Sequence, residues 1–232
     1  MSSVRYYDIH THKDFDSPDI IQIVSIECSE LHRMREGKLF SAGIHPWQIP
    51  ESFEHLLTDL ETLLKANSII AVGEIGLDKC CKTSFALQDV VLKMQLQLAE
   101  KYKKPVIIHC VKAWQEIIAI KNNHQNLKLI IHSFNKSYEQ AETLLKKGFF
   151  LSFGAAILKN DKIAEVLRRM PFDKIFLETD TSSTGIVELY KRAADIRSIK
   201  VEELGSLIED NFRKVFGEKF TNDRKQQLEY QN

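Results

Sequence analysis

Eight short apolar runs, rich in β-branched residues, recur along this chain of 232 residues and alternate with longer amphipathic patterns. Two examples are Pro105-Val-Ile-Ile-His109 and Lys128-Leu-Ile-Ile-His132. The runs are apolar almost throughout, which is typical of parallel strands buried on both faces. They cover residues 4–10, 20–27, 38–44, 68–75, 105–111, 127–133, 149–155 and 174–180. Eight strands that alternate with helices predict an α/β fold, the (β/α)₈ or TIM barrel.

The stretches between the runs predict helices, because their apolar residues recur at intervals of three and four. Residues 53–64, 138–145, 163–170 and 201–216 show this spacing, and Ser137 with Gln140 predicts a capping box for the second of them. Only about nine residues separate the first two strand runs, fewer than a parallel crossover with a helix requires. We therefore predict a distorted barrel whose first βα unit is shortened.

An open, doubly wound sheet is the competing architecture, but no glycine-rich phosphate loop follows the first run. The sequence predicts one domain over residues 1–220, followed by a polar C-terminal tail over residues 221–232.

The charge balance argues against a wide basic footprint for nucleic acid, because 32 basic residues are matched by 32 acidic ones. A polyanionic substrate would have to be held locally. The four cysteines fit no zinc-knuckle spacing, and no run reaches the roughly 18 apolar residues of a membrane span. These features predict a cytoplasmic protein with free thiols, no membrane association and no obligate protein partner.

Residues with metal-binding side chains end five of the eight predicted strands. The carboxyl ends of barrel strands meet at one mouth, where barrel enzymes do their chemistry. Side chains two apart in a strand share a side, which brings the first two histidines together. Each residue alone is more often structural, but the joint pattern predicts a centre for two divalent metal ions. Its six candidate ligands are His10, His12, Glu74, His109, His132 and Asp180.

The motifs around these residues resemble those of the TatD family of metal-dependent hydrolases, which belongs to the amidohydrolase superfamily. The resemblance runs from the first strand to about Phe216. It rests on Asp8-Ile-His-Thr-His12, Ala42-Gly-Ile-His-Pro46, Gly73-Glu-Ile-Gly-Leu-Asp78, Pro105-Val-Ile-Ile-His109, Ile131-His-Ser-Phe134, Leu177-Glu-Thr-Asp180 and Asn211-Phe-Arg-Lys-Val-Phe216. The resemblance implies a distorted TIM barrel and a Mg²⁺- or Mn²⁺-dependent deoxyribonuclease, with DNA as its substrate.

The resemblance also implies a division of the ligands. His10, His12 and Asp180 would hold one metal ion, His109 and His132 the second, and Glu74 would bridge the two. A metal ion lowers the pKa of its bound water to roughly 7, and Asp180 would accept the proton of that water. Glu74 and Asp180 are thus the predicted catalytic residues. The histidine-rich set suits Zn²⁺ or Mn²⁺, while Mg²⁺ prefers oxygen, so the metal identity stays open among the three.

The predicted substrate contacts are His45, which ends the third run, and Lys112, which follows the fifth. Family members often carry an arginine after the fifth strand, where this chain reads His109-Cys-Val-Lys112. The loop after Asp180 also departs from the family's usual sequence. Hydrolysis is therefore better supported than nuclease activity. The alternatives are a metal-dependent hydrolase of another small phosphoester, amide or lactone, and a non-catalytic scaffold. The presence of all six candidate ligands argues against the scaffold.

Overall fold

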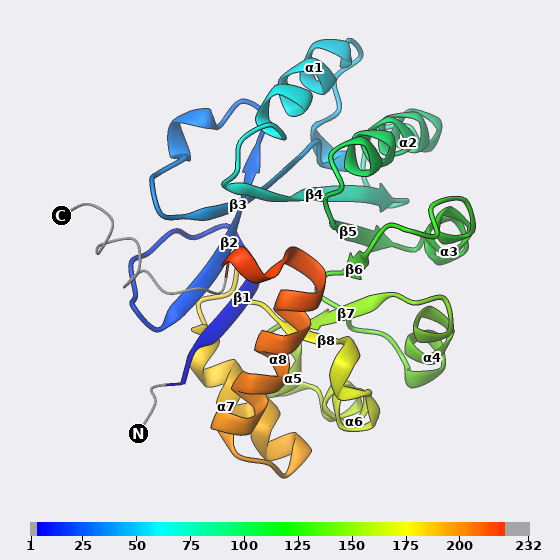
Figure 1. Cartoon of the computed structure of the whole chain (residues 1–232). Helices are drawn as coiled ribbons and strands as arrows, with labels where there is room; N and C mark the ends of the chain where they lie inside the picture. The colour runs from blue at the N-terminus through cyan, green and yellow to red at the C-terminus, as the bar shows by residue number, and fades with distance from the viewer. Residues whose placement is uncertain (1–3, 221–232) are drawn as a thin grey trace, which may run out of the picture.

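The computed structural model describes residues 4–220, and the predicted tail at residues 221–232 lies outside them. A single sheet of eight parallel strands follows the chain order from β1 to β8, which confirms the predicted barrel (Figure 1). The strands are β1 (Tyr6–Thr11), β2 (Ile20–Glu27), β3 (Leu39–Gly43), β4 (Ile69–Asp78), β5 (Val106–Val111), β6 (Leu129–Ile131), β7 (Phe150–Phe153) and β8 (Ile175–Leu177).

The barrel closes where the segment after β8 meets the end of β1. Thr11 and Asp180 form a parallel bridge. The Asp180 N–H donates to the His10 carbonyl at 2.9 Å, and the His12 N–H donates to the Asp180 carbonyl at 3.3 Å. The seam therefore lies at the carboxyl end of the strands, beside the predicted metal ligands.

The predicted shortening of the first βα unit is confirmed, and it extends to the second unit. No helix lies between β1 and β2, and only the 3₁₀ turn η1 (Leu31–Arg33) lies between β2 and β3. Lys38 ties the two connections together, with its Nζ 3.1 Å from Asp14 Oδ1 and 2.7 Å from Asp16 Oδ1. Loops linked by ion pairs thus replace two crossover helices (Figure 1).

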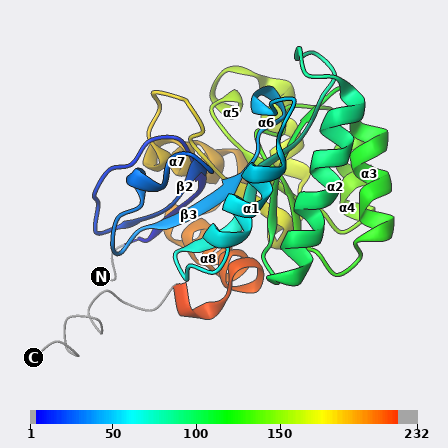
Figure 2. The ribbon, with the colours of Figure 1, turned by 90° about the horizontal axis from the view of Figure 1, so that it is seen from above.

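The remaining connections contain the outer helices, and Figure 2 shows α2, α3 and α4 side by side on the flank away from β2 and β3. The Ser137 Oγ accepts from the Gln140 N–H, which confirms the N-cap half of the predicted capping box. Within residues 4–220, no helix is both long and apolar enough to cross a membrane. The helices are α1 (Glu54–Leu63), α2 (Phe85–Lys101), α3 (Trp114–Asn123), α4 (Tyr138–Lys146), α5 (Ala156–Lys159), α6 (Asp161–Arg169), α7 (Ile186–Arg197) and α8 (Val201–Phe216).

Helix α8 packs against the barrel beside β1 and β8. Its Phe212 ring packs 4.7 Å from the ring of Tyr7 in β1. The buried Asn211 amide donates to the carbonyl of Phe172 at 2.7 Å and to that of Ile175, the first residue of β8, at 2.9 Å. Because buried carbonyls need partners, this asparagine fixes the approach of the chain to its last strand.

Strands β3, β6, β7 and β8 end one to three residues earlier than predicted, and at β6 and β8 side chains take over backbone hydrogen bonds. After β6, the Ser133 N–H donates to the Glu178 carboxylate at 2.8 Å. After β8, the Thr179 N–H donates to the Asp8 carboxylate at 2.9 Å. Strand β4 instead runs on past the predicted residue 75 to Asp78. The mouth of the barrel is therefore held by buried carboxylates as well as by the sheet.

Candidate metal centre

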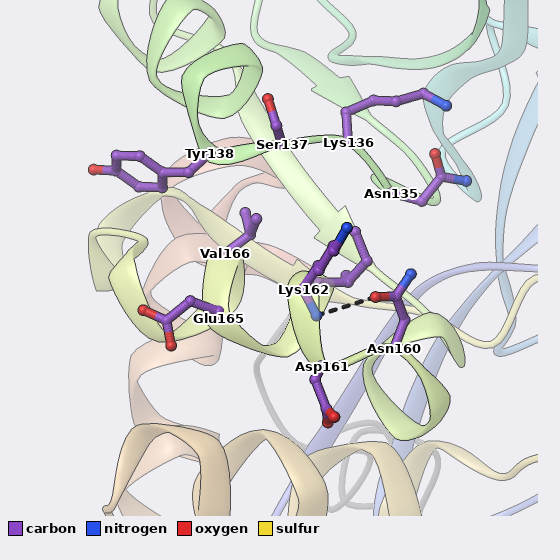
Figure 3. A pocket seen from close by; sticks show the side chains of 10 residues that line it. Asn135, Lys136, Ser137, Tyr138, Asn160, Asp161, Lys162, Glu165 and Val166 are labelled. Carbon is purple, nitrogen blue, oxygen red and sulfur yellow. Dashed lines mark hydrogen bonds between the residues drawn. The ribbon is translucent and has the colours of Figure 1, made fainter.

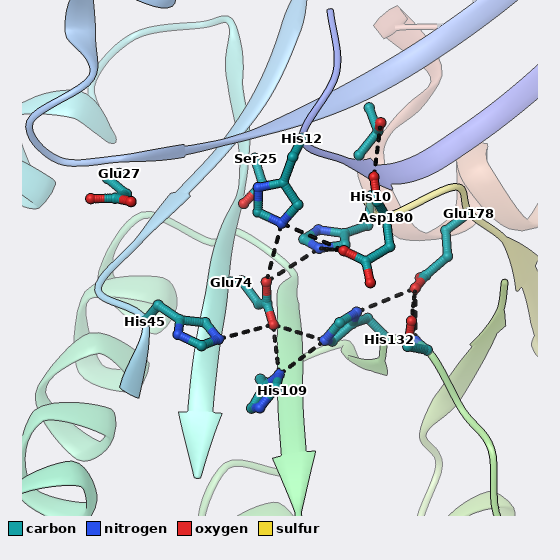
Figure 4. A network of polar contacts seen from close by, with 12 residues as sticks. His10, His12, Ser25, Glu27, His45, Glu74, His109, His132, Glu178 and Asp180 are labelled. Atoms are coloured by element: carbon teal, nitrogen blue, oxygen red, sulfur yellow. Dashed lines mark hydrogen bonds and ion pairs between the residues drawn. The ribbon is translucent and has the colours of Figure 1, made fainter. Parts of the chain in front are cut away.

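The six predicted ligands all lie at the carboxyl end of the barrel, in or just after their strands. His10 lies in β1, Glu74 in β4 and His109 in β5. The other three, His12, His132 and Asp180, follow β1, β6 and β8. Glu74 was predicted to end its strand, but it lies within the longer β4. The barrel brings all six together around one point (Figure 4).

Glu74 is the centre of this cluster. Its Oε2 lies 3.3 Å from His10 Nε2 and 3.6 Å from His12 Nε2. Its Oε1 lies 2.7 Å from His109 Nδ1 and 2.8 Å from His132 Nε2. The side chain is 7% exposed, and Figure 4 shows histidines on both sides of it. Oε2 of this buried carboxylate therefore faces two imidazoles, and Oε1 faces two others together with that of His45.

Asp180 completes the side of the cluster that contains His10 and His12. Its Oδ1 lies 3.8 Å from His10 Nε2 and 3.6 Å from His12 Nε2. The Asp180 backbone is left-handed, with φ of 50°, a conformation that aspartate tolerates better than most residues. This turn directs the carboxylate toward the two histidines while its backbone closes the barrel.

The two histidines on the opposite side each have a carboxylate behind them. His109 Nε2 lies 3.4 Å from Asp78 Oδ2, and His132 Nδ1 lies 3.2 Å from Glu178 Oε1. A carboxylate accepts only, so the outer nitrogen of each ring donates, and in the neutral ring the inner nitrogen is left with a lone pair for a metal ion. Metal-binding histidines are characteristically oriented in this way. His109 Nδ1 and His132 Nε2, 3.2 Å apart, are the two inner nitrogens.

His45 also lies in the cluster, but its outer ring nitrogen accepts a hydrogen bond instead of donating one. Its Nδ1 accepts from the Trp47 N–H at 3.2 Å, so in the neutral ring the proton is on Nε2. That Nε2 lies 3.2 Å from Glu74 Oε1. His45 therefore donates to Glu74, although its distances to Glu74 and His109 would also suit a ligand. The tautomer agrees better with the substrate role predicted for this residue.

The donor set fits divalent metal ions on three observations. The ligand atoms of one ion with bonds of about 2.1 Å lie roughly 3.0–3.4 Å apart, close to the spacings around Glu74. The cluster contains three overlapping groups of candidate ligands, and within each group the ligand atoms lie within 4.8 Å of one another. His10 Nε2 is buried, yet it makes no hydrogen bond within residues 4–220. Buried polar atoms are rarely left in that state. The three groups are His10–Glu74–His132, His10–His12–Asp180 and His45–Glu74–His109.

The electrostatics of the cluster also favour a cation. Burial lowers the pKa of His132, but Glu74 and Glu178 outweigh it and hold that pKa well above its usual value. Burial likewise raises the pKa of Glu74, but His132, His10 and His109 outweigh it and hold that pKa well below its usual value. The buried carboxylates thus stay charged and attract positive charge between them.

Lys112, the other predicted substrate contact, lies directly after β5 and is exposed, with φ of 55°. Beside the mouth, a groove of about 610 Å³ runs between the starts of α4 and α6 (Figure 3). None of the six ligands lines it. It contains Lys136 and Lys162 but also Asp161 and Glu165, so its charge is mixed and does not by itself mark an anion site.

Two buried carboxylates of the site had no role in the sequence-based prediction. Glu178 accepts from the Ser133 N–H and Oγ–H, both at 2.8 Å, besides facing His132. Asp8 accepts from the Thr179 N–H and from its hydroxyl at 2.7 Å, and thereby holds the residue before Asp180. Burial raises the pKa of Asp8 to about 7. The signal that could have found both is an acidic residue in, or directly after, an apolar run.

The family described as TatD related DNase matches residues 22–217 of the chain. The chain belongs to this family. It is therefore an enzyme of a family of metal-dependent hydrolases, as the resemblance of its motifs predicted. The match begins after β1, so the place of His10 and His12 in the cluster rests on their distances to Glu74 and Asp180.

Several relatives agree with this membership. A protein of Enterocytozoon bieneusi described as a TATDN1 homologue is 31% identical over 190 residues, which cover 77% of this chain and 68% of the relative. The uncharacterized metal-dependent hydrolase YcfH of Escherichia coli is 27% identical over 78% of this chain and 75% of its own. The crystal structure of YjjV, a TatD homologue from E. coli, superposes with a TM-score of 0.80 at 22% identity. That superposition covers 93% of this chain and 99% of YjjV and shows the shared barrel.

Proposed function

We propose that this protein is a deoxyribonuclease that hydrolyses DNA phosphodiester bonds with two divalent metal ions. The observation that carries the proposal is the position of Glu74, whose two oxygens face separate sets of imidazole nitrogens. A carboxylate with ligands beside both oxygens is arranged to bridge two ions. The family description, TatD related DNase, supports DNA as the substrate.

In this proposal His10, His12 and Asp180 hold the first ion, His109 and His132 hold the second, and Glu74 is shared. When bound, the ions supply Lewis acidity at the phosphodiester and a water of lowered pKa. The nitrogen-rich donor set favours Mn²⁺ or Zn²⁺, while Mg²⁺ prefers oxygen ligands. We therefore expect activity with Mn²⁺ at lower metal concentrations than with Mg²⁺.

Asp180 is the proposed general base. Its carboxylate is 30% exposed at the mouth and lies beside His10 and His12, so it can reach both the ligand shell and a water approaching from solvent. His45 and Lys112 are the proposed substrate contacts. His45 offers the Nε2–H that now faces Glu74, and Lys112 offers an exposed ammonium group after β5.

One observation favours a second candidate, hydrolysis of another small phosphoester, amide or lactone. The groove beside the mouth has mixed charge, and the whole chain has a formal net charge of zero. Proteins that grip long stretches of nucleic acid usually show a basic excess. A short or small substrate would need no such footprint.

Cleavage of end-labelled single-stranded DNA by chelator-stripped protein tests the proposal, with Mg²⁺, Mn²⁺ and Zn²⁺ restored in turn. We expect metal-dependent shortening that is lost in Glu74→Gln and kept in Glu142→Gln, a control at an exposed carboxylate of α4. Absence of DNA cleavage with every metal would contradict the proposal. Metal-dependent turnover of a lactone or small phosphoester by the same samples would then establish the second candidate.

The cellular setting is also part of the proposal. All four cysteines are free, which is typical of proteins in a reducing compartment. We propose that the enzyme works in the cytoplasm on DNA and without an obligate protein partner.

A further inference from the structure

Trp47 is a large exposed aromatic side chain held in place beside the metal cluster. It lies in the 3₁₀ turn η2 (Pro46–Gln48), directly after β3 and His45. Its residue is 63% exposed, yet its indole N–H donates to Asp78 Oδ2 at 2.7 Å. Its ring centre lies 4.9 Å from that of His45 and 5.8 Å from that of His109, nearly perpendicular to both.

Packing does not account for this residue. A tryptophan that stabilises a core is mostly buried, whereas most of this indole faces solvent. The turn that carries it is fixed on both sides of the ring. The Gln48 amide donates to the Glu27 carboxylate in β2, and Cys81 Sγ lies 3.8 Å from the Pro46 carbonyl oxygen. The exposed indole is thus a rigid surface rather than a mobile one.

The loops that follow the first two strands carry further exposed apolar groups. Phe15 follows β1 and Leu31 follows β2, at 39% and 55% exposed. Within residues 4–220, three of the five exposed large apolar side chains therefore lie after β1, β2 and β3. The loops after the first three strands therefore offer apolar side chains to solvent.

We propose that Trp47 is the platform on which a nucleobase next to the scissile phosphodiester stacks, an inference that rests on the proposed nuclease function. Every base has an aromatic face, and stacking on a protein ring is sequence-tolerant. A base inside a duplex is already covered on both faces by its neighbours. Trp47 therefore selects unpaired nucleotides, in single strands or at frayed ends.

Asp78 connects this platform to the cluster. The same Oδ2 accepts from the Trp47 indole at 2.7 Å and lies 3.4 Å from His109 Nε2. A base stacked on Trp47 is therefore positioned relative to His109 through one carboxylate. Trp47 acts as a specificity-determining residue, because it touches the base and not the reacting phosphorus.

The test compares kcat/KM for a short single-stranded oligonucleotide with that for an oligonucleotide of equal length whose nucleotides lack bases. We expect the wild type to prefer the base-bearing substrate by roughly 5- to 150-fold, which corresponds to the free energy of one base stacked on an aromatic ring. In Trp47→Ala this preference should fall to near one, mainly through a higher KM. Trp47→Phe, which keeps an aromatic face without the indole N–H, should restore most of it.

Val90→Ala is the matched control, since Val90 is an exposed apolar residue of α2 at 47% exposure and should leave the preference as in the wild type. DNA cleavage with an unchanged preference in Trp47→Ala would overturn the platform and leave the nuclease function standing. Equal cleavage of both substrates by the wild type would also overturn it. Absence of DNA cleavage by the wild type would overturn the proposed function, and the platform with it.

Discussion

Asp180 contacts His10 through both its backbone and its side chain. The Asp180 N–H donates to the His10 carbonyl at 2.9 Å, and its Oδ1 lies 3.8 Å from His10 Nε2. The first contact closes the barrel between β8 and β1, and the second brings a carboxylate to the candidate metal centre. Closure of the fold and placement of the ligand thus depend on one residue, and substitutions can separate the two.

Asp180→Asn should keep the fold and lose catalysis. Asparagine tolerates the left-handed backbone at this position and leaves the backbone hydrogen bonds intact. We expect kcat to fall at least about 100-fold while the free energy of unfolding changes by less than about 1 kcal/mol. Asp180→Val, a β-branched residue at φ of 50°, should lose about 1–3 kcal/mol of stability. Urea unfolding and turnover measure both effects, and full activity in Asp180→Asn would refute the general base.

Gly76→Ala should destabilise the barrel at His109. A Cβ at residue 76 would lie 1.9 Å from the His109 carbonyl oxygen, in the register where β4 pairs with β5. Because backbone atoms cannot yield at that distance, we expect the free energy of unfolding to fall by at least about 2 kcal/mol. Gly185→Ala is the control, since nothing lies within 4 Å of its added Cβ. Equal unfolding midpoints for the two variants would contradict the close approach.

The order of the eight strands and the meeting of the six predicted ligands were both predictable from the sequence. Buried parallel strands read as apolar runs, and a barrel gathers their carboxyl ends regardless of loop detail. The pairing of His10 with His12 followed from strand alternation. Strands β6 and β8 were predicted to extend further than they do. They end early because Glu178 and Asp8 replace sheet hydrogen bonds there.

The residues behind the ligands could not be predicted in the same way. The contact of Asp78 with Trp47 joins positions far apart in the sequence. The tautomer of His45 depends on a backbone N–H of a 3₁₀ turn, and no residue pattern in the sequence predicts that hydrogen bond. Contacts of this kind depend on loop conformation, whereas the ligand set depends on strand topology.

Glu178→Gln tests the support of His132. The variant keeps the shape of the side chain but replaces the carboxylate that holds His132 Nδ1 at 3.2 Å. Supporting groups of this type typically contribute 10- to 100-fold to metal affinity, so we expect a loss of that size. The measurement is competition with a chromophoric chelator. Glu100→Gln is the control, because Glu100 faces His124 at 2.9 Å, away from the cluster. Equal metal affinity in the two variants would show that Glu178 does not orient His132.

The cysteines should differ sharply in reactivity. Burial raises the pKa of the Cys28 thiol and that of the Cys110 thiol to about 12. At pH 8 only roughly one part in ten thousand of each would be the reactive thiolate. Cys80 is exposed and should react first with an aromatic disulfide reagent. Mass spectrometry of the modified native protein identifies the sites, and early labelling of Cys28 would be incompatible with its burial.

The central claim is that Glu74 bridges two metal ions that hydrolysis requires. The most direct measurement titrates Mn²⁺ into chelator-stripped protein and follows bound metal and DNA cleavage in the same samples. We expect two equivalents bound per chain, a cleavage rate that rises with the second, and weaker binding of both in Glu74→Gln. A single equivalent with full activity, or cleavage by the stripped protein, would contradict it.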